Sequence, residues 1–234
     1  MDALVRLAQW ATTWLIPWQC LLCKAPGDGM DLCTPCQRDM PLNQSCCARC
    51  ALPLPLPTDA CGECLRKTPP WHAAWVPFRY DWPMDRLESR FKFGRDLAAG
   101  RCLSTLWLQQ AWPTELPKAI VPVPLSTQRL RHRGYNQALE LARPLAKAMG
   151  VPLMRDVLRR TRPTSAQTDL ARLARRKNVR GAFQVRHGTV LPAHVALVDD
   201  VMTTGATLAE CARCLRRAGV KRVDVWAVAR AAGR

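Results

Sequence analysis

Eight cysteines in the first third of this 234-residue chain form four Cys-x-x-Cys pairs. The pairs are Cys20/Cys23, Cys33/Cys36, Cys47/Cys50 and Cys61/Cys64. A Cys-x-x-Cys turn presents two thiolates to one tetrahedral metal ion, and a second such turn completes the four ligands. Four thiolates fill the coordination shell, so the spacing predicts two Zn²⁺ ions with a structural role. Sequential pairing gives two separate sites, and a cross-braced pairing is the alternative.

A disulfide framework is the competing interpretation, because it also favours an even number of cysteines. The repeated two-residue spacing and the lack of an evident export signal favour zinc. This segment is rich in turn formers and poor in large apolar residues, so it needs a cross-link to fold. Cys46 adjoins Cys47 and offers an alternative ligand, whereas Cys211 is expected in the apolar stripe of a helix.

A second chemical motif begins at the apolar run Val195–Val198, which ends in Asp199 and Asp200. The loop that follows consists of Val201, Met202, Thr203, Thr204, Gly205, Ala206 and Thr207. A Thr/Gly loop entering a helix exposes backbone N–H groups and hydroxyls to one anion, and the helix dipole favours negative charge there. The two carboxylates are suited to accept hydrogen bonds from vicinal sugar hydroxyls. The segment therefore predicts a ribose 5-phosphate site; the alternative is that these residues only cap a turn and a helix.

The surrounding pattern predicts the elements that position this motif. The apolar run is followed by an amphipathic helix at 207–218 and a strand at 223–228, which together form a βαβ unit with its loop at the carboxyl end of the strand. Further strands are expected at 76–80 and 119–123. Helices are expected at 84–110, with Lys92 on a polar face, and at 136–149, where Pro144 should cause a kink or break.

Three regions follow from these patterns. Residues 1–19 are expected to form an amphipathic helix, because this apolar stretch is too short to span a membrane. Residues 20–68 are expected to form a double zinc-ribbon or knuckle module. Residues 69–234 are expected to form an α/β domain with a parallel sheet and flanking helices. With no membrane span or export signal expected, the protein is interpreted as cytoplasmic.

The segment 195–208 resembles the 5-phosphoribosyl-1-pyrophosphate (PRPP) motif of type I phosphoribosyltransferases. Two other stretches are similar to the competence protein F (ComF) family: Val121–Pro124 with the run Arg133–Gln137, and the spacing Arg160-x-Arg162-x-Thr164-x-x-Gln167 followed by Arg176. That family also carries N-terminal paired cysteines. The resemblance covers nearly the whole chain, from about residue 20 to residue 230, and implies a type I phosphoribosyltransferase fold.

The resemblance also implies roles for individual residues. Asp199 and Asp200 would hold the ribose hydroxyls directly or through Mg²⁺, and residues 203–207 would bind the 5-phosphate. The turn at Leu125, Ser126 and Thr127 falls where the family places its pyrophosphate loop. The segment 159–180 falls where phosphoribosyltransferases keep a mobile loop; its candidate ligand-gripping residues are Arg160, Arg162, Thr164, Gln167 and Arg176. No hood for an accepting base is identifiable, and the aromatic candidates Trp71, Trp75, Tyr80 and Trp82 are expected mainly in the core.

Charge is concentrated in the second part of the chain. Residues 1–68 carry six basic and six acidic side chains, so the formal +17 lies in residues 69–234, and the segment 129–186 alone carries 15 basic and 3 acidic residues. Such a surface attracts polyanions, although a merely solvated face is the common alternative. The resemblance implies a role in DNA uptake and natural transformation, with contact to single-stranded DNA and to protein partners of the uptake machinery. Two alternatives stay open: an active phosphoribosyltransferase that releases pyrophosphate, and a regulatory PRPP sensor.

Overall fold

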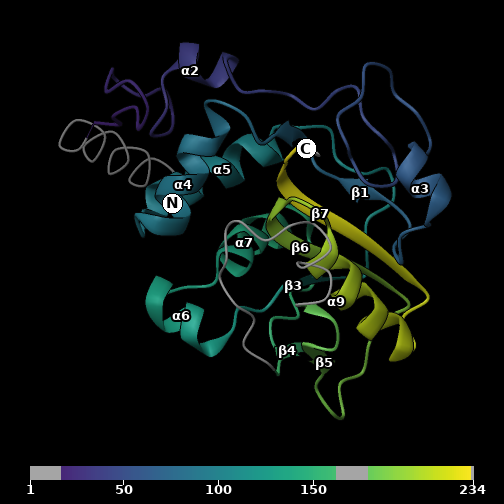
Figure 1. Ribbon diagram of the computed structural model, residues 1–234. Coiled ribbons are helices and arrows are strands. Elements are labelled where there is room, and N and C mark those ends of the chain that lie inside the picture. The colour runs from purple at the N-terminus through teal and green to yellow at the C-terminus, as the bar shows by residue number, and fades with distance from the viewer. Residues whose placement is uncertain (1–16, 162–178, 233–234) are drawn as a thin grey trace.

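The computed structural model describes residues 17–161 and 179–232, and most of the N-terminal helix expected at 1–19 lies outside these ranges (Figure 1). The described helices are α2 (Thr34–Arg38), α3 (Gly62–Arg66), α4 (Met84–Phe93), α5 (Leu97–Leu108), α6 (Thr127–Arg133), α7 (Gln137–Met149) and α9 (Ala206–Arg217). The strands are β1 (Ala74–Trp75), β2 (Phe78–Arg79), β3 (Ala119–Pro122), β4 (Leu158–Arg160), β5 (Phe183–Val185), β6 (His194–Met202) and β7 (Arg222–Arg230).

A parallel five-stranded sheet forms the centre of the molecule. Its order is β1-β7-β6-β3, and β2 pairs with β7 beyond the end of β1. The nearly continuous apolar runs of β3, β6 and β7 are typical of parallel strands that are buried on both faces. The expected α/β fold with a parallel sheet is confirmed. A separate antiparallel pair joins β4 to β5.

Alternate residues of the central strands contribute to two hydrophobic cores, one on each face of the sheet. Val195 and Leu197 belong to the core that is covered by α9 and the β4–β5 pair. Ala196 and Val198 belong to the core that is covered by α4, α5 and α7. Figure 1 shows α9 and α7 on opposite sides of β6. This alternation decides to which face each side chain at the end of β6 is directed.

Several element boundaries differ from those expected. The helix expected at 84–110 is broken, because Arg95 adopts a left-handed conformation and Asp96 caps α5 by accepting hydrogen bonds from the amides of Ala98 and Ala99. The strand expected at 76–80 is instead two short strands, β1 and β2. Pro144 lies inside α7 without ending it. Strand β6 continues through the acidic pair to Met202.

Among the described residues, no helix has both the length and the apolar character needed to cross a membrane.

Candidate functional site

The paired cysteines form two compact clusters of four sulfurs. Cys20, Cys23, Cys33 and Cys36 make the first cluster, and Cys47, Cys50, Cys61 and Cys64 make the second. The sulfurs of each cluster all lie within 4.8 Å of one another, and individual separations include 3.5 Å for Cys23–Cys33 and 3.7 Å for Cys50–Cys61. Zn–S bonds of about 2.3 Å in a tetrahedron place sulfurs about 3.8 Å apart. The clusters therefore fit zinc, and all twelve cysteines are free thiols without disulfides.

In each cluster, the backbone of the first Cys-x-x-Cys turn, here called the knuckle, explains how its two sulfurs converge. The residue after the second cysteine, Lys24 in one knuckle and Ala51 in the other, adopts a left-handed conformation. The amides of these two residues donate to the carbonyls of Cys20 and Cys47, which closes the turn. Sequential pairing is the arrangement that the structure adopts. Cys46 belongs to neither cluster.

The acidic pair lies at the carboxyl end of β6, the central strand. Successive residues of a strand point to opposite faces, so Asp199 follows Leu197 toward the α9 side, and Asp200 follows Val198 toward α4. There the ammonium of Lys92 lies 2.9 Å from the Asp200 carboxylate and 3.3 Å from that of Glu88, which is fully buried. Helix α4 thus delivers a cation and a third carboxyl group to the acidic pair.

Burial and mutual repulsion separate the protonation behaviour of these groups. Burial, reinforced by the charge of Asp200, raises the pKa of Asp199 and that of Glu88 to about 8 each. Burial also opposes ionisation of Asp200, but the Lys92 ammonium outweighs it and lowers the pKa of Asp200. The same carboxylates raise the pKa of Lys92 against the effect of its burial. At neutral pH the pair therefore consists of a protonated Asp199 beside an ionised Asp200 that is bound to Lys92.

The loop after the acidic pair turns into α9 at a glycine. Gly205 has φ +68°, which favours glycine, and it precedes the first residue of the helix, Ala206. The hydroxyl of Thr204 accepts a hydrogen bond of 3.4 Å from the amide of Ala206. Thr203 is exposed, while Thr204 and Thr207 are partly buried. The threonines expected to bind phosphate thus surround the start of a helix of 12 residues, whose dipole favours an anion.

The turn at 125–127 lies close to the acidic pair because β3 and β6 are neighbours. Pro122 is in register with Val198, so the segment after β3 leaves the sheet at the same edge as Asp199. Ser126 caps α6, with its hydroxyl accepting from the amide of Arg129 at 3.4 Å, and Thr127 begins that helix. The expected pyrophosphate turn therefore lies at the carboxyl edge of the sheet, beside the Thr/Gly loop.

Further cations approach this edge from α6 and β4. Burial and the neighbouring charge of Arg133 lower the pKa of Arg129, while the two aspartates act in the opposite direction. Burial and the charge of Arg129 likewise lower the pKa of Arg160, whose guanidinium packs over the Phe183 ring at 5.3 Å. The other candidates of the expected mobile loop, Arg162, Thr164, Gln167 and Arg176, lie outside the described residues.

Sequence reasoning missed the contribution of α4 and of α6. It placed Lys92 on a polar face without a partner, whereas the structure packs its largely buried side chain against Asp200. The available signal was the i,i+4 spacing of Glu88 and Lys92 within an amphipathic helix. The aromatic residues behave as expected in part, because Trp71 is buried and Trp75 packs edge-on against Trp226, but Trp82 is exposed.

Comparison with known proteins finds similarity over the cysteine-rich segment and over most of the chain. The family described as "Double zinc ribbon domain" matches residues 11–72. Competence protein F of Haemophilus influenzae is 36% identical over 175 residues, which cover 71% of this chain and 76% of that protein. The DNA utilization protein YhgH of Salmonella typhimurium is 35% identical over 223 residues, covering 92% of this chain and 98% of that protein.

This chain belongs to the ComF family. A more distant relative, competence protein ComFC of Streptococcus pneumoniae, is 29% identical over 155 residues, covering 65% of this chain and 66% of that protein. The family resemblance inferred from the motifs is confirmed, and the two cysteine clusters fit the double zinc ribbon at its N-terminus.

The two clusters predict a zinc content of two ions per chain. Metal analysis of the purified protein by mass spectrometry should give this value. Cys36→Ser and Cys64→Ser, each of which removes one ligand from a different cluster, should each lower the content to about one. A wild-type content well below two would contradict the assignment of both clusters to zinc.

The raised pKa of Asp199 predicts a pH-dependent effect of Asp199→Asn on stability. The folded protein holds this proton up to about pH 8, whereas an ordinary aspartate has a pKa of 3.8, so ionisation favours the unfolded chain increasingly between these values. Asparagine removes this penalty. Urea unfolding should show Asp199→Asn gaining stability over the wild type as the pH rises from 4 to 8, with no further gain above 8.

Asp81→Asn, at an exposed carboxylate, is the matched control and should show no such trend. A difference between Asp199→Asn and wild type that does not vary with pH would show that Asp199 ionises normally in the folded protein.

Proposed function

We propose that this protein binds PRPP at the carboxyl edge of its parallel sheet. The observation that carries the proposal is the acidic pair, a partly buried Asp199 and a buried Asp200, beside a Thr/Gly loop at the start of α9. Carboxyl groups alone would repel a phosphorylated ligand. Here Lys92 forms an ion pair with Asp200, and Arg129 and Arg160 approach from neighbouring elements. The carboxyl edge of the sheet therefore offers groups that can bind hydroxyls, and positive charges surround them.

Each part of the edge has a role in this proposal. Residues 203–207 bind the 5-phosphate through backbone amides and threonine hydroxyls. Asp199 and Asp200 bind the two ribose hydroxyls, since an ionised carboxylate accepts and a protonated one also donates a hydrogen bond. Residues 125–127 lie beside the pyrophosphate group. Arg160 and the residues that follow it, including Arg162, Thr164, Gln167 and Arg176, complete the proposed ligand-binding set.

Lys92 also bears on where Mg²⁺ is held. Asp200 already binds a cation, and the pKa of Asp199 is raised to about 8, so the pair is a poor resident site for a divalent ion. We propose that Mg²⁺ arrives with the pyrophosphate group of the ligand, whose charge it offsets. The protein's own residues orient the ribose.

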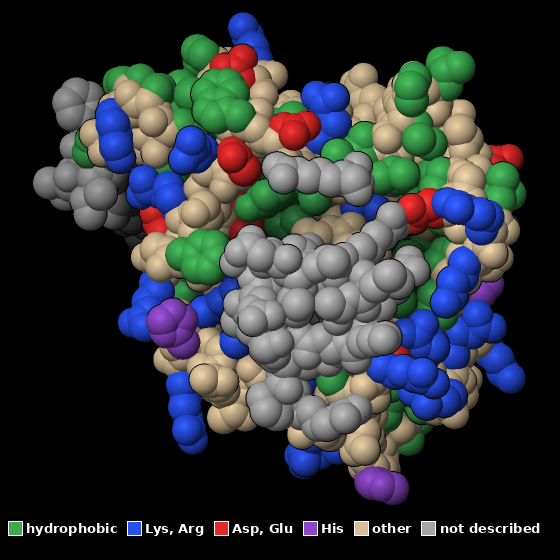
Figure 2. Space-filling model, viewed as in Figure 1, with side chains coloured by type: hydrophobic (Ala, Val, Ile, Leu, Met, Phe, Trp, Pro, Cys, Tyr) green, Lys and Arg blue, Asp and Glu red, His purple; other side chains and the backbone are tan. Residues whose placement is uncertain are grey.

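We propose that this site serves a protein of DNA uptake. The support is the family, whose members compared above are named for competence and for DNA utilization. Exposed arginines on α9, among them Arg213, Arg216 and Arg217, lie next to the β4–β5 pair, and the exposed Arg186 directly follows β5. Figure 2 shows Lys and Arg side chains gathered over this part of the surface, at the lower right. Such a face suits the backbone of single-stranded DNA.

Ribosyl transfer is the second candidate function. In this reaction an acceptor nucleophile would attack C1 of the ribose, and the C1–oxygen bond would break to release pyrophosphate. The cations on α4, α6 and β4 favour this candidate, because cations near the acidic pair would stabilise the negative charge that develops on a leaving pyrophosphate.

We also propose that the chain divides by function into a zinc module at 20–68 and a ligand-binding domain at 69–234.

Calorimetric titration of PRPP with Mg²⁺ into the wild-type protein should show one binding event per chain. Asp199→Asn/Asp200→Asn should abolish it. Lys92→Gln should weaken it about tenfold or more, because Asp200 then loses its counter-charge and either repels the ligand's phosphates as an unpaired carboxylate or takes up a proton and becomes a weaker acceptor. Lys221→Gln, at an exposed lysine at the opposite edge of the sheet, should bind as the wild type does. A wild-type protein that does not bind PRPP would overturn the proposal.

Single-stranded DNA binding should weaken steeply as salt rises, because each contact between a basic side chain and a phosphate releases a counterion. Fluorescence anisotropy at several salt concentrations measures the slope of log K against log salt. Arg186→Gln/Arg216→Gln should reduce its magnitude by about 1.4. Arg38→Gln/Arg66→Gln, which removes the same charge from the zinc module, should leave it unchanged. A salt-insensitive or absent interaction would contradict the DNA-binding part of the proposal.

A further inference from the structure

Arg230 joins the second cysteine cluster to the Thr/Gly loop. It lies at the end of β7, in register with Met202, and its side chain is buried. Its Nε donates to the carbonyl of Cys50 at 3.0 Å, and its Nη1 donates to the carbonyl of Met202 at 3.0 Å and to that of Thr203. A single planar guanidinium thus fixes a metal-ligand residue and the first turn of the loop relative to each other.

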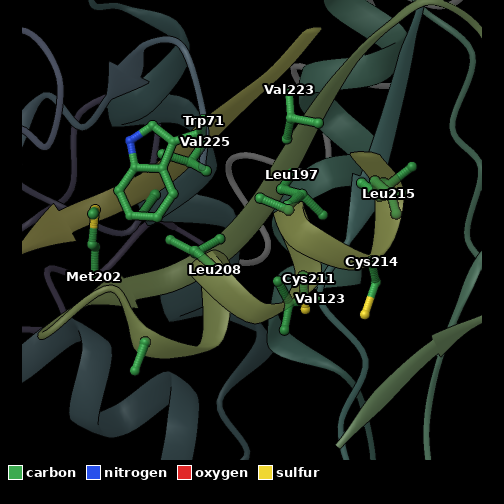
Figure 3. Packing of buried hydrophobic residues seen from close by; sticks show 14 of the residues in the cluster. Trp71, Val123, Leu197, Met202, Leu208, Cys211, Cys214, Leu215, Val223 and Val225 are labelled. Carbon is green, nitrogen blue, oxygen red and sulfur yellow. The ribbon is translucent and has the colours of Figure 1, made fainter. Parts of the chain in front are cut away.

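Trp71 makes a second connection between the same two places. Its indole N–H donates to the carbonyl of Arg49 at 2.6 Å. Its ring covers Gly205 so closely that a Cβ at that glycine would lie 3.1 Å from it. Figure 3 shows the ring beside Met202 and Leu208 in the α9-side core. The glycine therefore serves two needs, a left-handed backbone and the close approach of Trp71.

Both connections begin at consecutive carbonyls of one zinc knuckle and end on one loop. Arg49 and Cys50 belong to the turn whose sulfurs are metal ligands, so zinc fixes the direction of the carbonyls that receive these hydrogen bonds. We propose that Arg230 and Trp71 are positioning residues through which zinc at the second cluster holds residues 203–207 in their anion-binding conformation. Loss of that zinc releases the loop, which makes ligand binding dependent on the metal and the redox state of these thiols.

The first cluster differs in its surroundings. Cys20, Cys33 and Cys36 pack into the core on the opposite face of the sheet, with residues of α4 and α5. Its links to the body include a hydrogen bond of 3.4 Å from Arg90 to the carbonyl of Leu21 and an ion pair of 3.6 Å between Arg101 and Asp31. Metal loss there should disturb α4 and α5 before it disturbs the Thr/Gly loop.

Two matched cysteines separate these effects. Cys36 and Cys64 are each the third residue of a five-residue helix, and their exposed fractions are 8% and 6%. Amide hydrogen exchange, measured by mass spectrometry without any ligand, should show faster exchange of residues 203–207 in Cys64→Ser than in Cys36→Ser. Equal loop exchange in both folded variants would overturn the coupling.

Arg230→Gln tests the connection itself while all eight zinc ligands are retained. Zinc content should stay at two, the amides of residues 47–51 should keep their protection, and those of residues 203–207 should exchange about tenfold faster. Arg222→Gln, at the other end of β7, is the control for a general loss of stability and should not accelerate loop exchange selectively. If Cys64→Ser does not fold, the coupling is tested by comparing the exchange of residues 203–207 in Arg230→Gln with that in Arg222→Gln.

The consequence for ligand binding rests on the proposed function, whereas the coupling does not. Accelerated loop exchange in Arg230→Gln, together with weaker PRPP binding, supports both. Accelerated exchange in a protein whose wild type does not bind PRPP would overturn the proposed function and leave the coupling intact. Loop exchange in Arg230→Gln equal to that of the wild type would overturn the coupling, whatever the binding result.

Discussion

The ion pair between Lys92 and Asp200 is the interaction on which the candidate site depends. Two adjacent carboxyl groups at the end of a buried parallel strand cannot both ionise without a nearby cation. Lys92 supplies that charge at 2.9 Å, and it requires α4 to pack against the sheet at the height of the strand's end. The break between α4 and α5 at residues 94–96 allows the chain to change direction there, so that α4 can stay packed against the sheet.

The zinc ribbons act as parts of two cores rather than as an independently packed module. Cysteines of the first cluster join the core on the α4, α5 and α7 face, and those of the second join the core on the α9 face. Figure 1 shows α2 on the same side of the molecule as α4 and α5, and α3 on the side of β1. A short segment with few large apolar residues gains its stability in this way from metal and from the domain together. The same packing places the knuckle of the second cluster, Cys47–Cys50, against the loop that precedes α9.

The local motifs could be predicted from sequence because their chemistry depends on residues close in the chain. Two-residue spacing determines which sulfurs share a turn, and Gly205 followed by an amphipathic run indicates a loop entering a helix. The parallel α/β fold follows from buried apolar runs that alternate with helical patterns. Element ends were less predictable. Strand β6 extends through Asp199 and Asp200 because pairing with β7 continues to Met202, which local sequence does not reveal.

The sequence by itself determined which chemical groups are present, namely the cysteine pairs, the acidic pair and the Thr/Gly loop, and these motifs were enough to identify the family. Only the tertiary structure decided what surrounds them. Asp199 and Asp200 are neighbours in sequence, yet only Asp200 lies within ion-pair distance of Lys92, so its pKa is lowered while burial and the charge of Asp200 raise the pKa of Asp199. Partners such as Lys92, and the contacts of Arg230 with Cys50, 180 residues apart, are joined only when the chain folds. Electrostatic and packing energies depend on distance in space, and sequence separation does not encode it.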